Sequence, residues 1–555
     1  MKFNSLQPVM KQRLFVTISM LVILSSCNKD AFNFDKITKV EWDPEFAVPL
    51  VNSSVKFSDI NLGSNSILQV GADKSLSFVL KNTFISNSAS TFVPTITTNP
   101  NPSINNFTLS SAQVTAFSSV PINSTYSVAS SQNITFSAAT TNSVNIDIDS
   151  CILKQGFLKL VVQNSFPHDA AISISIPGVK KNGIPFTTNL NITANRTDSL
   201  NIDLVNSNID LSKNGTTSNQ LLVNYSVVLT KKNNTLTGNL NFIIRLNNPI
   251  LKIIYGDVKQ QNITNASFDS LPIPFFNLQN TIGALMLNDA SMKFTVTNSF
   301  GIPIGFNFTS FKGFSNANGS FSLNTAGISP SQFVTTSPTV VGQTSTSTLT
   351  LTKTNPLSSG SLLNLPGFLS NMPNSITIQG NGQTNPTGVP RPSFKNFILD
   401  TSKVKIDGEL TIPLDGKIFN FILKDTFDFN FGDVNTVESF IIRTYFNNAF
   451  PIDLTGTFRF VDNTFKPIYT IDGVTKPLIK SGVVSTSTGR VITPTATMND
   501  FSVSSDVVPD LGKVKYVIFT VNLSTANPST QSVKIYSDDY VDVKMGIRAK
   551  LKTKL

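Results

Sequence analysis

The chain contains very few of the side chains on which most enzymes depend. Its 555 residues include one histidine, His168, and two cysteines, Cys27 and Cys151. A zinc site needs several His or Cys ligands, so this composition nearly excludes one. A Ser-His-Asp hydrolase would depend on His168, but the sequence has no Gly-x-Ser-x-Gly elbow. We therefore predict a protein that is not an enzyme and that holds no metal and no cofactor, with His168 as a solvated loop residue.

The aromatic residues that suit exposed binding surfaces are also scarce. The chain has one Trp and 8 Tyr against 43 Phe, whereas glycan-binding surfaces favour Trp and Tyr. No glycine-rich phosphate loop lies between a strand and a helix, which leaves nucleotide binding unsupported. Basic residues do not interleave with aromatic ones as they do in nucleic-acid-binding proteins, so we expect no nucleic-acid partner.

Charged residues make up only 14% of the chain, well below the usual quarter. Ser, Thr and Asn take their place, and 40% of the residues are apolar. Polar, uncharged surfaces with β-branched and aromatic interiors favour strands over helices. We therefore predict an all-β fold of several antiparallel β-sandwich-like modules in tandem, with at most one or two short helices. The best helix candidate is 358–372, which contains Pro366-Gly367 and stops before Pro373.

The first thirty residues have the layout of an export signal. Three basic residues precede an apolar run, 14–24, that is too short to span a bilayer. The run closes on Leu24-Ser25-Ser26-Cys27, which resembles the lipobox of bacterial lipoproteins. This resemblance implies that a signal peptidase cleaves before Cys27 and that Cys27 carries lipid. Acyl chains hold a protein at a bilayer because each buried methylene contributes about 0.8 kcal/mol.

The residues after Cys27 read Asn28-Lys29-Asp30. A short lysine-plus-acid signal of this kind resembles that of surface-exposed lipoproteins of the Bacteroidota, and the whole chain looks like large uncharacterised lipoproteins of that group. The resemblance implies a lipid-anchored outer-membrane protein, with the cell surface favoured over the periplasmic face. If Cys27 is acylated, Cys151 has no disulfide partner, and its apolar surroundings predict a small buried residue.

One local pattern occurs three times in the chain. It is an alternating strand, then Asn-[Ser/Ala]-Phe-[Pro/Gly], then a second alternating strand, at 164–167, 298–301 and 448–451. Alternation on both flanks gives each strand one buried face, and the residues between the strands are turn formers. We predict three equivalent corners with buried rings, formed by Asn164 and Phe166, Asn298 and Phe300, and Asn448 and Phe450.

The corners are 134 and 150 residues apart, which is a domain-scale repeat. The strands around them resemble the immunoglobulin-like sandwich of group-2 late-embryogenesis-abundant domains. We predict a signal peptide at 1–26, a tether at 27–39 and a Ser/Thr-rich N-terminal β domain at 40–145. Three β modules follow, at 146–265, at 266–392 with a Ser/Thr/Pro-rich stretch and the helix candidate, and at 393–555.

The C-terminal segment alternates strictly between apolar and mostly basic positions. Its apolar residues share one face, which we expect to point into the core: Val541, Val543, Met545 and Ile547. The opposite face carries a basic stripe of Lys544, Arg548, Lys550, Lys552 and Lys554. Two hypotheses account for the stripe. The lysines protect an edge strand from aggregation, or they contact anionic lipid or an acidic envelope partner.

Three acidic clusters leave carboxylate chemistry open: Asp147 with Asp149, Asp425 with Asp428, and Asp538 with Asp539 and Asp542. Such groups bind calcium or hydrolyse glycosides in other proteins. We expect a non-enzymatic binding, scaffolding or assembly component of the outer membrane, whose partner is an envelope protein or anionic lipid. One alternative is a glycan- or nutrient-binding lipoprotein beside an outer-membrane transporter. Another is a carboxylate-dependent hydrolase.

Overall fold

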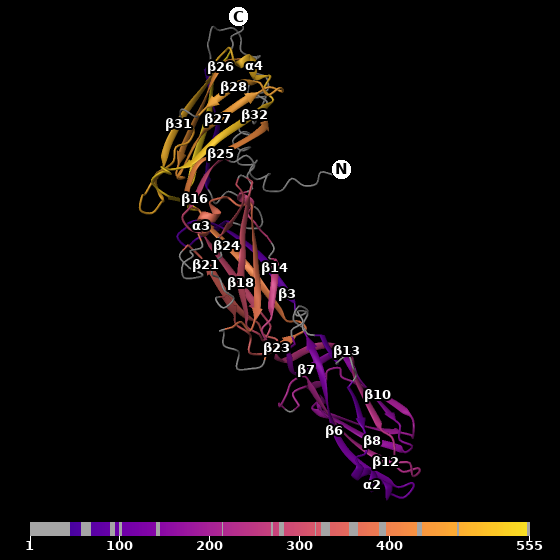
Figure 1. The fold of residues 1–555 in the computed structure, drawn as a ribbon. Helices are drawn as coiled ribbons and strands as arrows, with labels where there is room; N and C mark the ends of the chain where they lie inside the picture. Colours follow the sequence, from indigo (N-terminus) through magenta and orange to yellow (C-terminus); the bar gives the residue numbers. More distant parts are fainter. Residues whose placement is uncertain are drawn as a thin grey trace.

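The computed structural model describes residues 45–551, apart from 57–67, 89–94, 99–102, 140–144, 214, 268–269, 277–281, 317, 324–332, 354–363, 388–395, 430–435 and 474–476. Cys27 and the last two basic residues of the predicted stripe, Lys552 and Lys554, lie outside the described residues. The described residues form antiparallel sheets, which confirms the predicted all-β fold of sandwich-like modules. Figure 1 shows an elongated molecule in which three modules follow one another along its length.

The lower module, at the bottom of Figure 1, is an eleven-stranded sheet whose two parts face each other. Tyr225 and Phe242, from opposite parts, are in ring contact with centroids 4.5 Å apart. The strand order is β23-β13-β7-β11-β8-β12-β6-β4, with β5, β9 and β10 pairing to β13, β8 and β7. The strands are β4 (Thr95–Thr98), β5 (Ser103–Phe107), β6 (Thr125–Ala139), β7 (Asp147–Asn164), β8 (Asp169–Lys181), β9 (Ile184–Ile192), β10 (Thr197–Asp203), β11 (Asn208–Asp210), β12 (Gln220–Thr230), β13 (Leu240–Asp257) and β23 (Asn396–Leu399).

The middle module consists of two facing sheets. One has the order β14-β22-β18-β19 with β15 and β20 at its sides, and the other the order β2-β3-β24-β17-β21. Phe294 of β17 meets Phe308 of β18 between the sheets, with ring centroids 4.6 Å apart. The strands are β2 (Leu68–Val70), β3 (Leu76–Ser88), β14 (Asn262–Ser267), β15 (Leu271–Pro272), β17 (Ser291–Asn298), β18 (Ile304–Ser315), β19 (Gly319–Leu323), β20 (Phe333–Thr335), β21 (Ser345–Leu351), β22 (Ser375–Thr384) and β24 (Lys403–Pro413).

The upper module pairs a sheet of order β1-β34-β26-β31 with a sheet of order β16-β25-β32-β27-β28, which β33 joins, and it includes a small ribbon, β29-β30. The Tyr469 hydroxyl donates to the Ser502 carbonyl at 3.2 Å and links β28 to β31. The strands are β1 (Glu45–Lys56), β16 (Ile282–Leu287), β25 (Asp415–Asp428), β26 (Val437–Asn448), β27 (Ile452–Val461), β28 (Pro467–Asp472), β29 (Val483–Val484), β30 (Val491–Thr493), β31 (Thr495–Val503), β32 (Tyr516–Thr525), β33 (Val533–Lys534) and β34 (Tyr540–Leu551).

The described residues contain three short α-helices, one more than the sequence predicts: α2 (Ser111–Ser118), α3 (Leu365–Leu369) and α4 (Val508–Leu511). Helix α3 falls within the predicted 358–372, of which 358–363 lies outside the described residues. It begins where the Asn364 side chain accepts the Gly367 amide at 3.0 Å. Pro366 stands in its first turn, where a proline costs no hydrogen bond.

The N-terminal segment does not form the separate domain predicted at 40–145. Strand β1 pairs with β34 in the upper module, β3 pairs with β24 in the middle module, and β4 to β6 belong to the lower module. The later boundaries fail in the same way, because β16 pairs with β25 and β23 pairs with β13. Alternation in a sequence identifies the buried face of a strand but not its hydrogen-bonding neighbour. The chain therefore runs from the upper module to the lower one and back.

The buried side chains form two clusters. One is continuous through the lower and middle modules, and the other fills the upper module. Cys151 lies in the first cluster with 2% of its surface exposed, as the sequence predicts. Burial raises the pKa of its thiol to about 12, so the reactive thiolate is strongly disfavoured.

The three corners share one set of hydrogen bonds made by a buried asparagine. Nδ2 of Asn164, Asn298 and Asn448 donates to the carbonyl four residues later, at 2.9, 2.9 and 3.1 Å. Oδ1 accepts the amide of the corner Phe at 2.9, 2.9 and 2.8 Å. Nδ2 also reaches a third segment at the carbonyls of Thr193, Thr336 and Lys480. Each asparagine thus closes its turn and ties it to a neighbouring segment.

The three corner rings differ in burial. Phe166 and Phe300 are 1% and 0% exposed and belong to the continuous lower cluster. Phe450 is only partly buried, which corrects the prediction for this residue. Neither cluster of described core residues includes it, and the residue before it is a buried Ala449 where the other corners have serine.

We expect Asn164→Ala to destabilise the lower module by about 1–3 kcal/mol, because buried carbonyl and amide groups would lose their partner. Asn191→Ala, at an exposed position of β9, is the matched control and should change stability by less than about 0.5 kcal/mol. Denaturant unfolding of both variants provides the measurement. Equal effects of the two substitutions would contradict a structural role for the corner amide.

Candidate functional site

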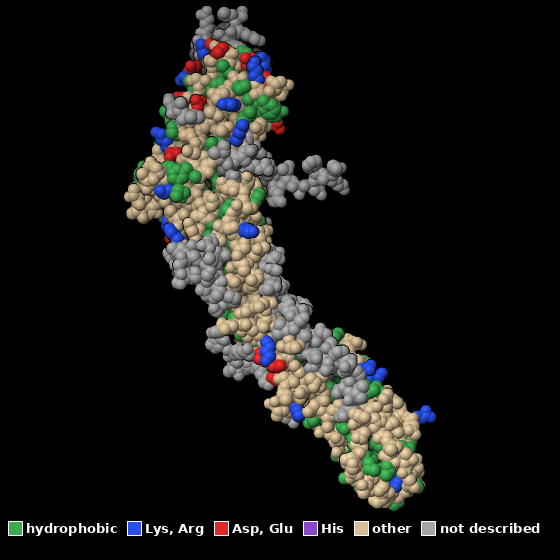
Figure 2. Space-filling model, viewed as in Figure 1, with side chains coloured by type: hydrophobic (Ala, Val, Ile, Leu, Met, Phe, Trp, Pro, Cys, Tyr) green, Lys and Arg blue, Asp and Glu red, His purple; other side chains and the backbone are tan. Residues whose placement is uncertain are grey.

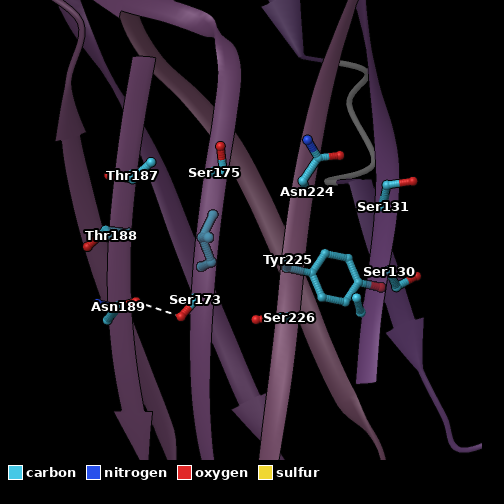
Figure 3. A pocket seen from close by; sticks show the side chains of 12 residues that line it. Ser130, Ser131, Ser173, Ser175, Thr187, Thr188, Asn189, Asn224, Tyr225 and Ser226 are labelled. Atoms are coloured by element: carbon cyan, nitrogen blue, oxygen red, sulfur yellow. Dashed lines mark hydrogen bonds between the residues drawn. The ribbon is translucent and has the colours of Figure 1, made fainter. Parts of the chain in front are cut away.

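A shallow groove of about 710 Å³ crosses strands β6, β12, β8 and β9 of the lower module. Figure 3 shows its polar side chains spread along the four strands. The lining is Ala129, Ser130, Ser131, Ser173, Ile174, Ser175, Thr187, Thr188, Asn189, Asn224, Tyr225 and Ser226. None of these twelve residues is charged, so the groove carries hydroxyl and amide groups without a titratable side chain apart from the tyrosine.

The groove side chains form a grid because their strands pair in register. Asn224 stands between Ser131 and Ser175, and Ser175 is opposite Thr187. One step along the strands, Ser226 stands between Ala129 and Ser173, with Asn189 beyond Ser173. Neighbouring strands are about 4.8 Å apart, and residues on one face repeat every 6.6 Å or so. The groove therefore presents regularly spaced hydrogen-bonding groups.

The alternate residues of the same strands hold the grid in place from beneath. Ile174 and Tyr225 are 3% and 5% exposed and belong to the core cluster. The Tyr225 ring contacts Phe242 and Phe107, at 4.5 and 6.1 Å between centroids. The ring is thus committed to the core and leaves the groove without an exposed aromatic surface.

Most of the outward side chains in the groove are open to solvent. Ser173, Thr187 and Asn189 are exposed, and Asn224 and Ser226 are half-buried. The Ser173 hydroxyl donates to Oδ1 of Asn189 at 2.7 Å (Figure 3). Such groups can exchange hydrogen bonds with water for bonds to a polar ligand. The lining has no carboxylate, imidazole or thiol, so its hydroxyl groups have no general acid or base of the usual kind beside them to activate them.

These groove residues carry no distinctive motif in the sequence. Their signal is the alternation of Ser or Asn with apolar residues in Ile172-Ser173-Ile174-Ser175 and in Val223-Asn224-Tyr225-Ser226. Alternation of this kind marks any half-exposed strand. Only the sheet order shows that the two stretches are neighbours.

His168 is buried, which corrects its interpretation as a solvated residue. Its ring is 0% exposed and meets Phe117 of α2 edge-to-face, with centroids 5.0 Å apart. Nδ1 accepts the Lys232 amide at 3.2 Å, and Nε2 lies 2.7 Å from the Thr235 carbonyl. Because Nδ1 is an acceptor, Nε2 is the donor to that carbonyl. Both nitrogens serve the backbone, so His168 is a structural residue.

Helix α2 covers the corner at which His168 lies. Ser110 and Gln113 form a capping box at its start. At its end, the buried Lys231 ammonium donates to the carbonyls of Ser118 and Val120 at 2.8 and 2.9 Å. These contacts close the lower end of the molecule around Phe117, which is fully buried.

The acids of the first cluster bind different partners. Asp147 is bound by Lys259, and Asp149 accepts the Ser218 hydroxyl at 3.0 Å. In the backbone ladder, Asp425 is opposite Phe519 and Asp428 opposite Tyr516 of β32. Across the described ranges, no group of three His, Cys, Asp or Glu residues is arranged to hold a metal ion.

The third acidic cluster lies where the upper and middle modules meet. Asp538 forms ion pairs with Lys74 and Arg490 at 3.1 and 2.8 Å. Asp539 is 5% exposed and accepts the Tyr536 amide at 2.9 Å. Burial raises the pKa of Asp539 to about 6, with the Asp538 charge adding to the shift. The nearby backbone bonds, such as the Leu76 amide to the Ile535 carbonyl at 3.1 Å, join the two modules.

The basic stripe does not lie on an edge strand, so the edge-protection hypothesis is wrong. Strand β34 is central, with β1 on one side and β26 on the other. Arg548 pairs with Glu45 at 3.6 Å and Lys550 with Glu438 at 3.4 Å, which partly neutralises the stripe. Lys544 is exposed. On the opposite face Met545 is buried, while Val541, Val543 and Ile547 are half-buried.

No protein-family model and no curated protein matches the chain. Among solved structures it is similar to a Parabacteroides distasonis protein described as secreted, with TM-score 0.29 and 10% identity over 54% of this chain and 89% of that one. It is also similar to the PBSX exported protein XepA, with TM-score 0.12 and 8% identity over 53% and 83%. The tandem CBM22 domain of Xyn10C from Paenibacillus barcinonensis gives TM-score 0.11 and 9% identity over 59% and 98%. Likenesses at these TM-scores support no conclusion about this chain. No described helix is long and apolar enough to cross a membrane.

We expect the stability of the Asp539→Asn variant, relative to that of the wild type, to increase as the pH rises from 4 to 6. The folded-state pKa is raised, so wild type loses up to about 1.4 kcal/mol per pH unit once the unfolded-state carboxyl ionises. The stability that the protonated Asp539 carboxyl contributes is fully present below pH 4, and its loss ends near pH 6. The measurement is denaturant unfolding of both proteins at pH 4, 5, 6 and 7.

Asp506→Asn is the control for this experiment. Asp506 is exposed, and a hydrogen bond from the Ser504 side chain lowers its pKa. Its removal should change the pH dependence weakly and with the opposite sign. A constant difference between Asp539→Asn and wild type across this pH range would show that Asp539 ionises normally.

Proposed function

We propose that this protein is a non-enzymatic, lipid-anchored component of the bacterial outer membrane that holds a binding module away from the bilayer. Its lipid is carried by Cys27, its rod is formed by the three modules, and its binding face is the groove of the lower module. The cell surface is the favoured side. An envelope protein or a polymer of the envelope is the expected partner.

The observation that supports this proposal most directly is the position of β1. Glu45, which follows Cys27 by 18 positions, pairs with Lys550. The other end of β1, Lys56, pairs with Tyr540, next to the residues that contact the middle module. Glu45 therefore lies at the end of the upper module that faces away from the rest of the rod. The groove lies in the module at the opposite end (Figure 1).

The length of the segment between Cys27 and Glu45 supports the same orientation. Eighteen residues span at most about 65 Å when fully extended. A lipid on Cys27 would therefore hold the upper module nearest the membrane. The groove strands β6, β8, β9 and β12 belong to the module at the other end of the rod, so the groove would lie in the module farthest from the membrane (Figure 1).

The chemistry of the described residues supports a binding role rather than catalysis. The groove has no carboxylate or imidazole, and His168 is committed to backbone groups. Two acids of the hydrolase alternative are held in ion pairs, Asp147 with Lys259 and Asp538 with Lys74 and Arg490. This arrangement favours the non-enzymatic expectation.

A neutral glycan is the second candidate, as the ligand of the groove. The uncharged grid of Ser, Thr and Asn is the specific observation in its favour. Hydroxyl and amide groups can bond a polyhydroxylated chain, while the absence of charge gives no attraction to a polyanion. The absence of an exposed aromatic ring predicts modest affinity, because stacking contributes much of the energy of sugar binding.

Cys27→Ser should abolish acylation and move the protein from the membrane fraction to the soluble fraction, because the acyl chains are its main hold on the bilayer. Metabolic labelling with an alkyne fatty acid, followed by fractionation, measures both effects. Cys151→Ser is the control and should keep label and location. An unmodified Cys27 peptide in the mature wild-type protein, detected by mass spectrometry, would refute the anchor.

Ser173→Glu should weaken binding of a neutral polysaccharide by tenfold or more, because it places a charge in the middle of the uncharged grid. The probe is a panel of dextran, laminarin and xylan, with alginate as a polyanion, in affinity gel electrophoresis. Ser322→Glu, at an exposed position of β19, is the matched control and should bind as wild type does. If none of the neutral polymers retards the wild-type protein, the glycan candidate fails and the scaffold proposal remains.

A further inference from the structure

The turn between β27 and β28 holds a phenylalanine out into solvent. Phe465 is 56% exposed, and its backbone is left-handed with φ of 64°. This conformation is uncommon for a bulky residue. Hydrogen bonds fix it: the Phe465 amide donates to the Asp462 carbonyl at 3.1 Å, and the Asp462 amide to the Lys466 carbonyl at 3.0 Å. Oδ1 of Asp462 accepts the amides of Thr464 and Lys466 at 2.8 and 2.9 Å.

A second aromatic ring supports Phe465 from the adjacent strand. Tyr516, the first residue of β32, stacks on it with centroids 5.0 Å apart and planes inclined by 8°. Tyr516 is half-buried, so the pair presents one exposed ring backed by another. The orientation of Phe465 is therefore set by packing and does not depend on a partner.

The charges around this pair are mixed, and Figure 2 shows basic and acidic side chains together over the outer end of the upper module. Lys466, Lys513 and Lys515 are exposed beside it. Lys513 pairs with Asp510 at 2.6 Å, and Asp462 lies in the turn itself. The surface is thus an exposed ring with lysine side chains around it and a small net charge. A partner that covers it must accept an apolar ring and tolerate lysines.

The turn lies at the same end of the upper module as the start of β1. Val461 of β27 pairs with Tyr516, whereas Ile452 at the other end of β27 follows the corner that faces the middle module. Phe46, the second residue of β1, is a further exposed ring at 39%. It is opposite Ala549, near the end of β34. Two exposed phenylalanines therefore mark the end from which the segment leading to Cys27 departs.

We propose that this outer end of the upper module is a membrane-contacting surface, in which the Phe465 ring enters the headgroup region of the bilayer. The inference rests on the lipid anchor of the proposed function. An anchor 18 residues before Glu45 keeps this end close to the lipid, and an exposed apolar ring with neighbouring lysines suits the boundary between headgroups and acyl chains. The partner is the lipid surface itself.

The contact has a specific effect on the protein. Acyl chains on a single cysteine limit the distance of the rod from the membrane but leave the rod free to tilt. A ring inserted at the end of the rod adds a second point of attachment and favours an upright rod. The insertion depends on apolar burial, and Asp462 and Asp510 offset two of the three lysines, so anionic lipid should increase it only modestly.

The test uses the chain from position 27 onward with Cys27→Ser, so that neither the acyl chains nor the apolar run 14–24 masks a weaker contact. The probes are vesicles of phosphatidylcholine alone and vesicles with added phosphatidylglycerol, each at low and high salt. We expect cosedimentation with both vesicle types. Phe465→Gly should lower the partition coefficient about tenfold. Glycine fits the left-handed backbone, so this variant keeps the turn while removing the ring.

Phe314→Ser removes a ring of similar exposure, 51%, from the middle module and is the control, with expected binding equal to that of the parent protein. In a Trp42→Phe background, Phe465→Trp should show a blue-shifted emission on vesicles and Phe314→Trp should not. Equal partitioning of Phe465→Gly and its parent would overturn the proposal. So would a concentration-dependent dimer that Phe465→Gly abolishes without any vesicle binding, because a second copy would then cover the ring. Acylation of Cys27 is measured separately, so failure of the anchor and failure of this contact give different results.

Discussion

The architecture depends on backbone hydrogen bonds between segments that are far apart in the chain. Strands β34 and β24 would be edge strands without partners from the N-terminal segment, and open edges expose rows of amide and carbonyl groups. Strand β1 covers the first, with Val48 opposite Ile547, and β3 covers the second, with Leu80 opposite Leu410. The upper and middle modules are therefore completed by residues synthesised before the lower module. None of the three modules is a continuous segment that could be separated from the chain at a linker.

The asparagine corners give the modules a common direction. The corner at Asn448 bonds to Tyr540 through the Ala449 amide, on the side of the middle module. The corner at Asn298 meets β23 through the Gly301 amide and the Phe397 carbonyl, and β23 pairs with β13 of the lower module. The third corner, at Asn164, has no further module to meet, and α2 covers it with Phe117. This cap resembles the altered terminal units that close repeat proteins. It leaves the groove on the last module of the series.

The sequence shows the strand content, the buried faces and the Asn-x-Phe turns, because each of these depends on residues within about ten positions of one another. It does not show which strands are neighbours. Glu45 and Lys550 pair across almost the whole chain, and nothing in the alternation of either strand selects the other. The burial of His168 was missed for the same reason, since Phe117 covers it from a helix that has few apolar residues. The basic stripe resembles that of an edge strand, because nothing in the alternation of the C-terminal segment indicates that β1, a mostly exposed strand from the other end of the chain, covers it.

The pairing of β1 with β34 also determines how the molecule carries a mechanical load. A pull on the lower module, resisted by the proposed anchor at Cys27, would act along the axis of β1 and in opposite directions on its two ends. The ladder from Glu45 to Lys56 is then loaded in shear, so that all its hydrogen bonds share the force at once. Peeling from one end would break them one at a time. The strand that follows the proposed anchor is thus placed in the geometry that best resists extraction from the rod.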